Sequence, residues 1–257
     1  MSIENSSLPQ RLLWILTRNK AIGVVLLLAL IGAANIFSQR PTDTTRLLAA
    51  YDAAINDAAV YKSSNVRHLR PLTFDPVTKE TTVVALTSYD YRLGPNTLGD
   101  KIYVWVTPVP EVQETCRFFS GNLELSLRQL LGLPPDYQLA NFVVMTVAEG
   151  QIFRPAADPN VSTPLPCASP TPSNCGQEFP KNVPAPYVRW FADWALRSWV
   201  ISETNQPPGY PWTRLGYTYN WKPGADKYGA SEYVIQPGSS VTVLDIIPYK
   251  QYCSPKP

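Results

Sequence analysis

The longest apolar segment of the chain, Ala21–Phe37, holds no charged residue. At 1.5 Å per residue it gives about 25 Å of helix, slightly short of the ~30 Å hydrocarbon core of a bilayer. Arg11, Arg18 and Lys20 precede it, and Arg40 alone follows closely. Because basic flanks stay on the cytoplasmic side, the pattern predicts a single-pass membrane anchor over 21–37 with a cytoplasmic segment 1–20. Everything beyond it is then extracytoplasmic, or periplasmic in a Gram-negative cell.

A cleaved signal peptide is the alternative interpretation of this segment. Its apolar core would be Ala21–Ile31, and the small residues Gly32, Ala33 and Ala34 would offer a cleavage site. Against this, the preceding region is long and carries its own apolar patch around Trp14. We therefore expect an uncleaved anchor that contacts membrane lipid.

Beyond the anchor, apolar residues at helical spacing predict three helices, and β-branched or alternating runs predict strands. A membrane-proximal helix, Thr42–Tyr61, lies within 38–64, and the region 65–257 forms the globular domain. The predicted helices in that domain are Leu123–Leu131 and Pro186–Ser202, and the predicted strands are 81–88, 101–107, 141–148, 215–221, 230–235 and 240–247. Without regular β-α-β spacing, this order predicts an α+β fold with a mainly antiparallel sheet, two or three helices and long Pro-rich loops.

Composition narrows the class of partner. The chain has 22 Lys and Arg against 20 Asp and Glu, and the small excess lies in residues 1–20. The exported part is neutral, so its charge gives no reason to expect a nucleic-acid partner. No Gly-rich phosphate loop or dinucleotide fingerprint is present, so the sequence predicts no cofactor.

All four cysteines follow the predicted anchor, and in an oxidising compartment an even number indicates disulfides. Cys167 and Cys175 close a short segment within the Pro-rich loop 155–186, which favours this pair. Cys116 would then pair with Cys253. The spacing of the four cysteines matches no zinc motif, and we predict no metal site.

Aromatic residues concentrate between Tyr187 and Tyr233, a stretch with five of the seven tryptophans. One hypothesis is a stacking platform in which Trp212, Tyr217, Tyr219 and Trp221 bind a flat ligand such as a sugar ring. The last three share one face of an alternating strand. The other interpretation is that this face packs on the helix 186–202, with Trp190 and Trp194 buried in the core.

Candidate catalytic residues are few. Arg214, Ser231 and Glu232 together resemble the general layout of ADP-ribosyltransferase sites, which implies a transferase. Adjacent residues of a strand point to opposite faces, however, and an ion pair is the structural alternative.

His68, the only histidine, is a candidate general base or a surface residue. Asp90, Asp100, Glu149 and Asp158 include possible partners for a glycosidase-type carboxylate pair. Since no catalytic motif is complete, the leading hypothesis is a membrane-tethered extracytoplasmic protein that binds or scaffolds envelope components, with an envelope protein or glycan as partner. The alternative is an envelope enzyme, a glycan hydrolase or an ADP-ribosyltransferase-like transferase.

Overall fold

The computed structural model describes residues 43–167, 175, 178–199 and 209–254. The chain divides into two units, Met1–Arg46 and Leu47–Pro257, and the strands that the structure describes belong to the second. The predicted anchor 21–37 lies outside the described residues. Among the residues that are described, no helix is both long enough and apolar enough to cross a membrane.

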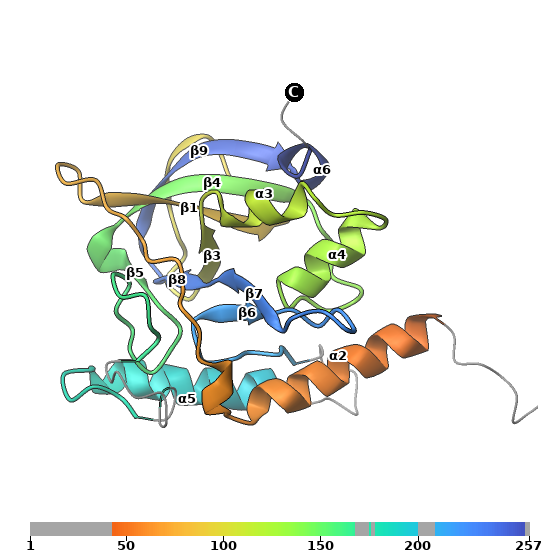
Figure 1. The fold of residues 1–257 in the computed structure, drawn as a ribbon. Coiled ribbons are helices and arrows are strands. Elements are labelled where there is room, and N and C mark those ends of the chain that lie inside the picture. Colours follow the sequence, from red (N-terminus) through yellow and green to blue (C-terminus); the bar gives the residue numbers. More distant parts are fainter. Residues whose placement is uncertain (1–42, 168–174, 176–177, 200–208, 255–257) are drawn as a thin grey trace, which may run out of the picture. The chain divides into compact units, whose positions relative to one another are not determined.

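A seven-stranded antiparallel sheet dominates the second unit (Figure 1). Its order is β2-β9-β4-β1-β3-β8-β5, and a separate two-stranded sheet joins β6 to β7. The large sheet consists of β1 (Glu80–Thr87), β2 (Gly94–Thr97), β3 (Val104–Pro108), β4 (Asn141–Ala148), β5 (Ile152–Phe153), β8 (Tyr233–Ile235) and β9 (Ser240–Pro248). The small sheet consists of β6 (Tyr217–Tyr219) and β7 (Tyr228–Ser231). The α+β class and the mainly antiparallel sheet are therefore confirmed.

Five helices accompany the sheets in the described part of the chain. They are α2 (Asp43–Ala59), α3 (Glu111–Cys116), α4 (Leu123–Leu130), α5 (Ala185–Trp199) and α6 (Tyr249–Tyr252). Short 3-10 turns occur at Ser63–Asn65 and Glu149–Gln151. The Asn122 side chain caps α4 by accepting a hydrogen bond from the backbone N–H of Leu125.

The central strands are apolar on both faces because each face covers its own core. β1 and β4 pair along their full length, from Glu80 opposite Ala148 to Thr87 opposite Asn141. Val83 and Met145 face a core formed largely by the sheet itself, whereas Val84 packs with the helices on the other face. Burial on both sides explains the continuous apolar runs in the sequence.

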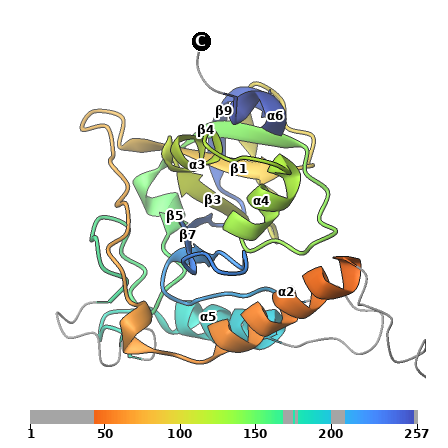
Figure 2. The same ribbon diagram turned by 45° about the vertical axis from the view of Figure 1, so that its right-hand side comes forward.

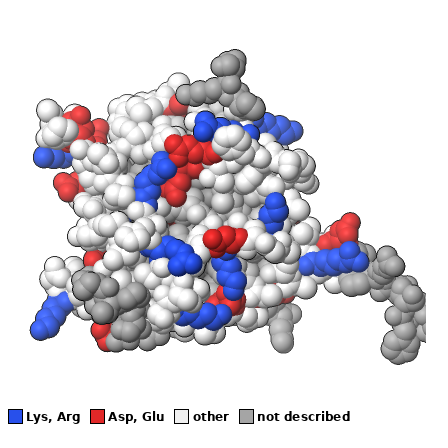
Figure 3. All heavy atoms as spheres, viewed as in Figure 1, with Lys and Arg blue, Asp and Glu red and all other residues white. Residues whose placement is uncertain are grey.

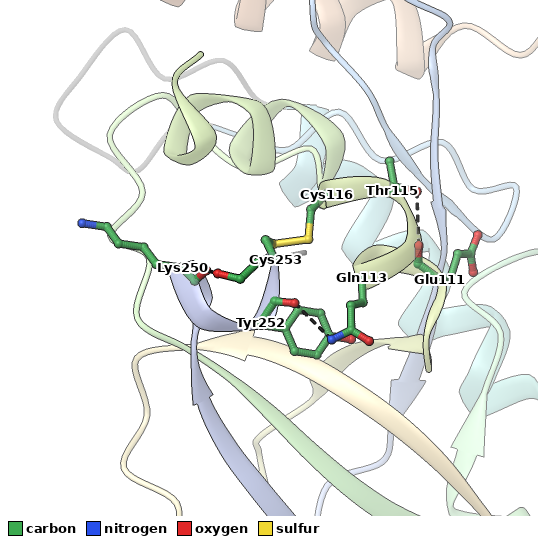
Figure 4. The surroundings of a disulfide bond; sticks show 8 residues. Glu111, Gln113, Thr115, Cys116, Lys250, Tyr252 and Cys253 are labelled. Carbon is green, nitrogen blue, oxygen red and sulfur yellow. Dashed lines mark hydrogen bonds between the residues drawn. A yellow bond between two sulfur atoms is a disulfide. The ribbon is translucent and has the colours of Figure 1, made fainter. Parts of the chain in front are cut away.

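The second face of the sheet is covered by α3, α4 and α6, and a disulfide joins two of these helices. Cys116 at the end of α3 bonds to Cys253 just after α6 (Figure 4). Beside the bond, the Gln113 side-chain amide donates to the Tyr252 carbonyl, and the Tyr252 ring stacks on Phe142 at 4.1 Å between centroids. The second disulfide joins Cys167 to Cys175, so both predicted pairs are confirmed.

α2 and α5 lie on the far side of the small sheet from the large one, as Figures 1 and 2 both show. The face with Tyr219 and Trp221 packs mainly against α2, and Trp221 meets Tyr51 edge-on at 5.6 Å. We expected this face to pack on the helix 186–202. That expectation was wrong, because the main partner of the face is α2. Trp199 of α5 reaches the same cluster, but only at its margin.

One carboxylate fastens α2 to the small sheet. Asp57 accepts hydrogen bonds from Lys62, from Lys227 after β6 and from the Tyr219 hydroxyl. Burial opposes ionisation of this carboxyl, but the bonds from Lys227, Lys62 and Tyr219 outweigh it and lower the pKa of Asp57 to about 2. The helix is thereby held to a strand more than 150 residues away in the sequence.

The Pro-rich loop 155–186 begins inside the domain rather than on its surface. Arg154 is fully buried and donates hydrogen bonds to Thr163 and to the Leu165 carbonyl. Its aliphatic part lies against Gly216, where a Cβ atom would approach the Arg154 Cδ to 2.7 Å. The segment 155–158 is buried around this side chain.

Candidate functional site

A cavity of about 650 Å³ lies between the second face of the large sheet and the small sheet. β1 and β3 form one wall, the turn after α4 and the segment from Tyr210 to Tyr219 form the opposite wall, and α5 closes one side. The connection from β1 to β3 forms the rim, where Tyr89, Arg92 and Ile102 are exposed. All of these elements belong to the unit Leu47–Pro257.

Aromatic rings make up much of the interior surface. Trp105 of β3 meets Trp194 of α5 at 5.6 Å and Trp212 at 6.1 Å between ring centroids, both edge-on. Tyr103 adds a further edge-on contact with Trp194 at 6.3 Å. All four line the cavity, so its apolar wall is continuous from the sheet to α5.

A break between two strands brings Glu232 to the cavity. The predicted strand 230–235 is in fact two strands, β7 and β8, which belong to different sheets. Glu232 lies between them, and its backbone N–H donates to the Gly216 carbonyl at 2.8 Å. β3 pairs with β8 up to Val106 opposite Tyr233, so continuing this register places Thr107 opposite Glu232. Both residues line the cavity.

The neighbours of Glu232 are each fixed by a hydrogen bond. The Ser231 N–H and hydroxyl both donate to the Glu111 carboxylate of α3. The Tyr233 hydroxyl donates to the Arg70 carbonyl on the other side of the chain. With both neighbours held, the backbone at Glu232 has little freedom to turn its side chain away.

The Glu232 carboxyl is the principal ionisable group of the cavity. Its Oε2 atom is covered by protein and has no hydrogen-bond partner among the described residues. Burial raises the pKa of Glu232 to about 8, because the charged form loses its hydration without a compensating partner. Near neutral pH the group is therefore mostly protonated.

The residues of the predicted transferase-like set are not brought together. Arg214 donates to the Ala59 carbonyl at 3.0 Å, and its guanidinium lies 4.3 Å from the centroid of Trp199. Ser231 is occupied by Glu111, and only Glu232 of the three lines the cavity. His68 is exposed in the segment after α2 and is likewise not a lining residue.

The predicted aromatic platform is divided by the fold. Trp212, Tyr217 and Tyr219 line the cavity, whereas Trp221 is buried against α2 and donates to the Arg128 and Leu133 carbonyls. The role of these four residues in binding remains a prediction. Trp190 and Trp194, which we expected to be buried, are only half-buried, and Trp194 faces the cavity.

Of the four candidate carboxylates, only Asp90 lines the cavity, and it is exposed at the rim. Asp100 and Glu149 are exposed, while Asp158 accepts a hydrogen bond from the backbone N–H of Asn160. Within the described ranges, no cluster of three or more His, Cys, Asp or Glu side chains is placed to hold a metal ion.

Sequence reasoning did not identify Trp105, Thr107 and Trp194 as residues of a site. The alternation in 101–107 does place Tyr103, Trp105 and Thr107 on one face, which is the available signal. No protein-family model, curated protein or solved structure matches this chain.

Proposed function

We propose that the domain binds a small, predominantly apolar molecule in this cavity while the segment 21–37 tethers it to a membrane. The observation that carries the proposal is the cavity itself, whose 650 Å³ falls within the ~300–1,000 Å³ of typical ligand sites. An aromatic wall with one half-buried carboxyl group matches the composition of such sites. The aromatic residues predicted as a platform then act as part of an enclosed pocket.

The rim of the cavity supports entry of an apolar molecule. Tyr89, Ile102 and Tyr210 line the cavity and are 68%, 51% and 39% exposed. Large apolar side chains that stay exposed together mark binding sites more often than scattered ones do. The entrance is thus suited to the same kind of ligand as the interior.

The extracytoplasmic location is supported by the basic flank of the segment 21–37 and by the two disulfides. The face of the molecule in Figure 3 carries basic and acidic side chains interspersed, without a large patch of one sign on that face. Mixed charge of this kind gives no reason to expect a polyanion as partner, and it is compatible with a module that binds small molecules. An envelope protein or glycan remains the proposed macromolecular partner.

Topology can be tested with reporters fused after Pro257. We expect a reporter that requires export to be active and a cytoplasm-dependent reporter to be inactive, because the basic flank retains the N-terminus inside. N-terminal sequencing of the membrane-bound protein should begin at or near Met1. Activity of the cytoplasm-dependent reporter alone would contradict the proposed location.

Ligand binding can be tested by calorimetry with tert-butylbenzene, a neutral apolar probe, on the full chain in lipid nanodiscs. Empty nanodiscs supply the background for partition into lipid. We expect saturable binding, with Trp105→Ala weakening the affinity by about tenfold, because loss of one well-placed aromatic contact costs on the order of 1 kcal/mol or more. Phe118→Ala is the matched control, since Phe118 is 76% exposed and does not line the cavity. Absence of saturable binding would refute the proposal.

A second candidate, an envelope enzyme, is favoured by the chemistry of Glu232. A pKa near 8 suits a group that exchanges a proton close to neutral pH. A glycosidase needs two carboxyl groups about 5–9.5 Å apart, and the second carboxyl of the lining, Asp90, is at the exposed rim. Recovery of a bound molecule chemically unchanged after long incubation would favour the binding module.

A further inference from the structure

The ionisable group in the wall of the cavity is an acid, and the basic residue of the described lining lies outside the interior. Glu232 is half-buried in the wall with its Oε2 atom covered by protein, whereas Arg92 is exposed at the rim, two positions from Asp90 in the sequence. No other Lys, Arg or His lines the cavity in the described part of the chain. An anionic ligand would therefore meet a carboxyl group with no interior cation to offset it.

The walls around this carboxyl also favour positive charge. Trp105 lies two residues from Thr107 on the same face of β3, and Thr107 is opposite Glu232 by continuation of the β3–β8 register. Trp194 and Trp212 extend the indole surface from Trp105. The negative face of an indole ring attracts a cation, most strongly where water is excluded.

We infer that the ligand is an organic cation, an amine or a quaternary ammonium with an apolar body, whose charged end lies between Glu232 and the indole rings. This inference rests on the proposed function and specifies its ligand. The ligand cation would supply the partner that the carboxylate lacks, and its apolar body would fill the aromatic cavity. With a neutral ligand the carboxyl would stay protonated and form no ion pair.

Binding of a permanent cation should depend on pH in a defined direction. Because burial raises the pKa of Glu232 to about 8, the free protein must lose a proton before the carboxylate can pair. Affinity should thus rise by about tenfold per pH unit up to pH 8 and level off above it, since only the ionised fraction binds. Below pH 8, binding should release one proton to the buffer.

The other ionisable groups near the site either stay neutral between pH 6 and 9 or are tested with a control variant. Burial raises the pKa of Tyr91, Tyr137 and Tyr210 above their ordinary value, so these lining side chains stay neutral between pH 6 and 9. Tyr233 follows Glu232 in the chain, and burial likewise raises its pKa. Glu111 of α3, which accepts hydrogen bonds from the adjacent Ser231, is a second carboxyl whose pKa is raised by partial burial. Both bonds from Ser231 go to one oxygen of Glu111, and a glutamine side-chain oxygen can still accept them, so Glu111→Gln keeps Ser231 in place and is the matched control for Glu232→Gln.

The experiment compares phenyltrimethylammonium with its neutral isostere tert-butylbenzene and with benzoate. Calorimetry on the full chain in nanodiscs, at pH values from 6 to 9 and in two buffers of different ionisation enthalpy, gives affinity and proton release. At pH 9 we expect the cation to bind about tenfold or more tightly than the isostere, consistent with a desolvated cation–π contact and an ion pair. Benzoate should bind more weakly than either.

Glu232→Gln should abolish the pH dependence and remove the part of the cation preference that comes from the ion pair. It should retain binding of the isostere, which also reports an intact fold. Glu111→Gln should keep both properties of the unmodified protein. If the isostere binds as tightly as the cation at every pH, the inference fails while the proposed function stands. If neither probe binds, the proposed function fails and the inference fails with it. A pH dependence that disappears in Glu111→Gln but persists in Glu232→Gln would assign it to the wrong carboxyl and overturn the inference.

Discussion

Removal of the Cys116–Cys253 disulfide is expected to lower the free energy of unfolding by roughly 5 kcal/mol, on a chain-entropy basis. The bond links residues 137 positions apart, whereas Cys167–Cys175 spans only 8. The same relation gives the short loop roughly 2.5 kcal/mol, about half as much. Since small domains are stable by about 5–15 kcal/mol in total, loss of the long bridge is expected to leave the domain near its unfolding threshold.

The measurement is urea unfolding of two double variants, Cys116→Ala with Cys253→Ala and Cys167→Ala with Cys175→Ala. Each replaces two buried half-cystines, so the cavity cost is similar and the difference reports the loop. In the first variant, the Gln113–Tyr252 hydrogen bond beside the lost bridge is left to hold α3 to α6. Equal losses in the two variants would contradict the expected dependence on loop length.

Replacement of Gly229 by alanine is expected to cost about 3 kcal/mol or more, as overpacking at a rigid site does. An added Cβ atom would lie 2.0 Å from the Thr218 hydroxyl and 2.3 Å from the Leu130 carbonyl. That hydroxyl is already held, since it donates to Leu130 and accepts from the Ala230 N–H. The small sheet would have to move away from the end of α4, which also opens the cavity wall.

Gly150→Ala provides the control for this substitution. Gly150 has ordinary backbone geometry and no atom within 4 Å of its would-be Cβ position, so we expect a change within ~0.5 kcal/mol. Chemical denaturation of both variants gives the comparison. A loss at Gly229 as small as that at Gly150 would show that β6 and β7 are less firmly seated on α4 than the contacts indicate.

Elements with a strong local pattern could be predicted from the sequence, and elements set by distant partners could not. The strand 141–148 and the helix 123–131 follow from continuous β-branched residues and from a capped leucine face, and both are present. β2 was missed because Gly94, Pro95 and Asn96 are turn-forming residues. Its partner, β9, lies more than 140 positions further along the chain, and proline is tolerated at a sheet edge.

The site shows the same limit. The face shared by Tyr103 and Trp105 is visible in the alternation of 101–107, and Glu232 could be nominated as a polar residue within an apolar run. What no local pattern contains is the break at Glu232, because it depends on Glu111 holding Ser231 and on Tyr233 reaching Arg70. The convergence of β3, α5 and Trp212 around that carboxyl is equally a product of long-range packing.

The two edges of the large sheet affect whether copies of the protein aggregate at high concentration. One edge is β2, four residues long with Pro95 in it, and the other is β5, only two residues long. Short or proline-containing edges offer few unpaired N–H and C=O groups to an incoming strand. The long, aggregation-prone strands β1 and β4 are therefore shielded from intermolecular strand addition as long as these two edges stay in place.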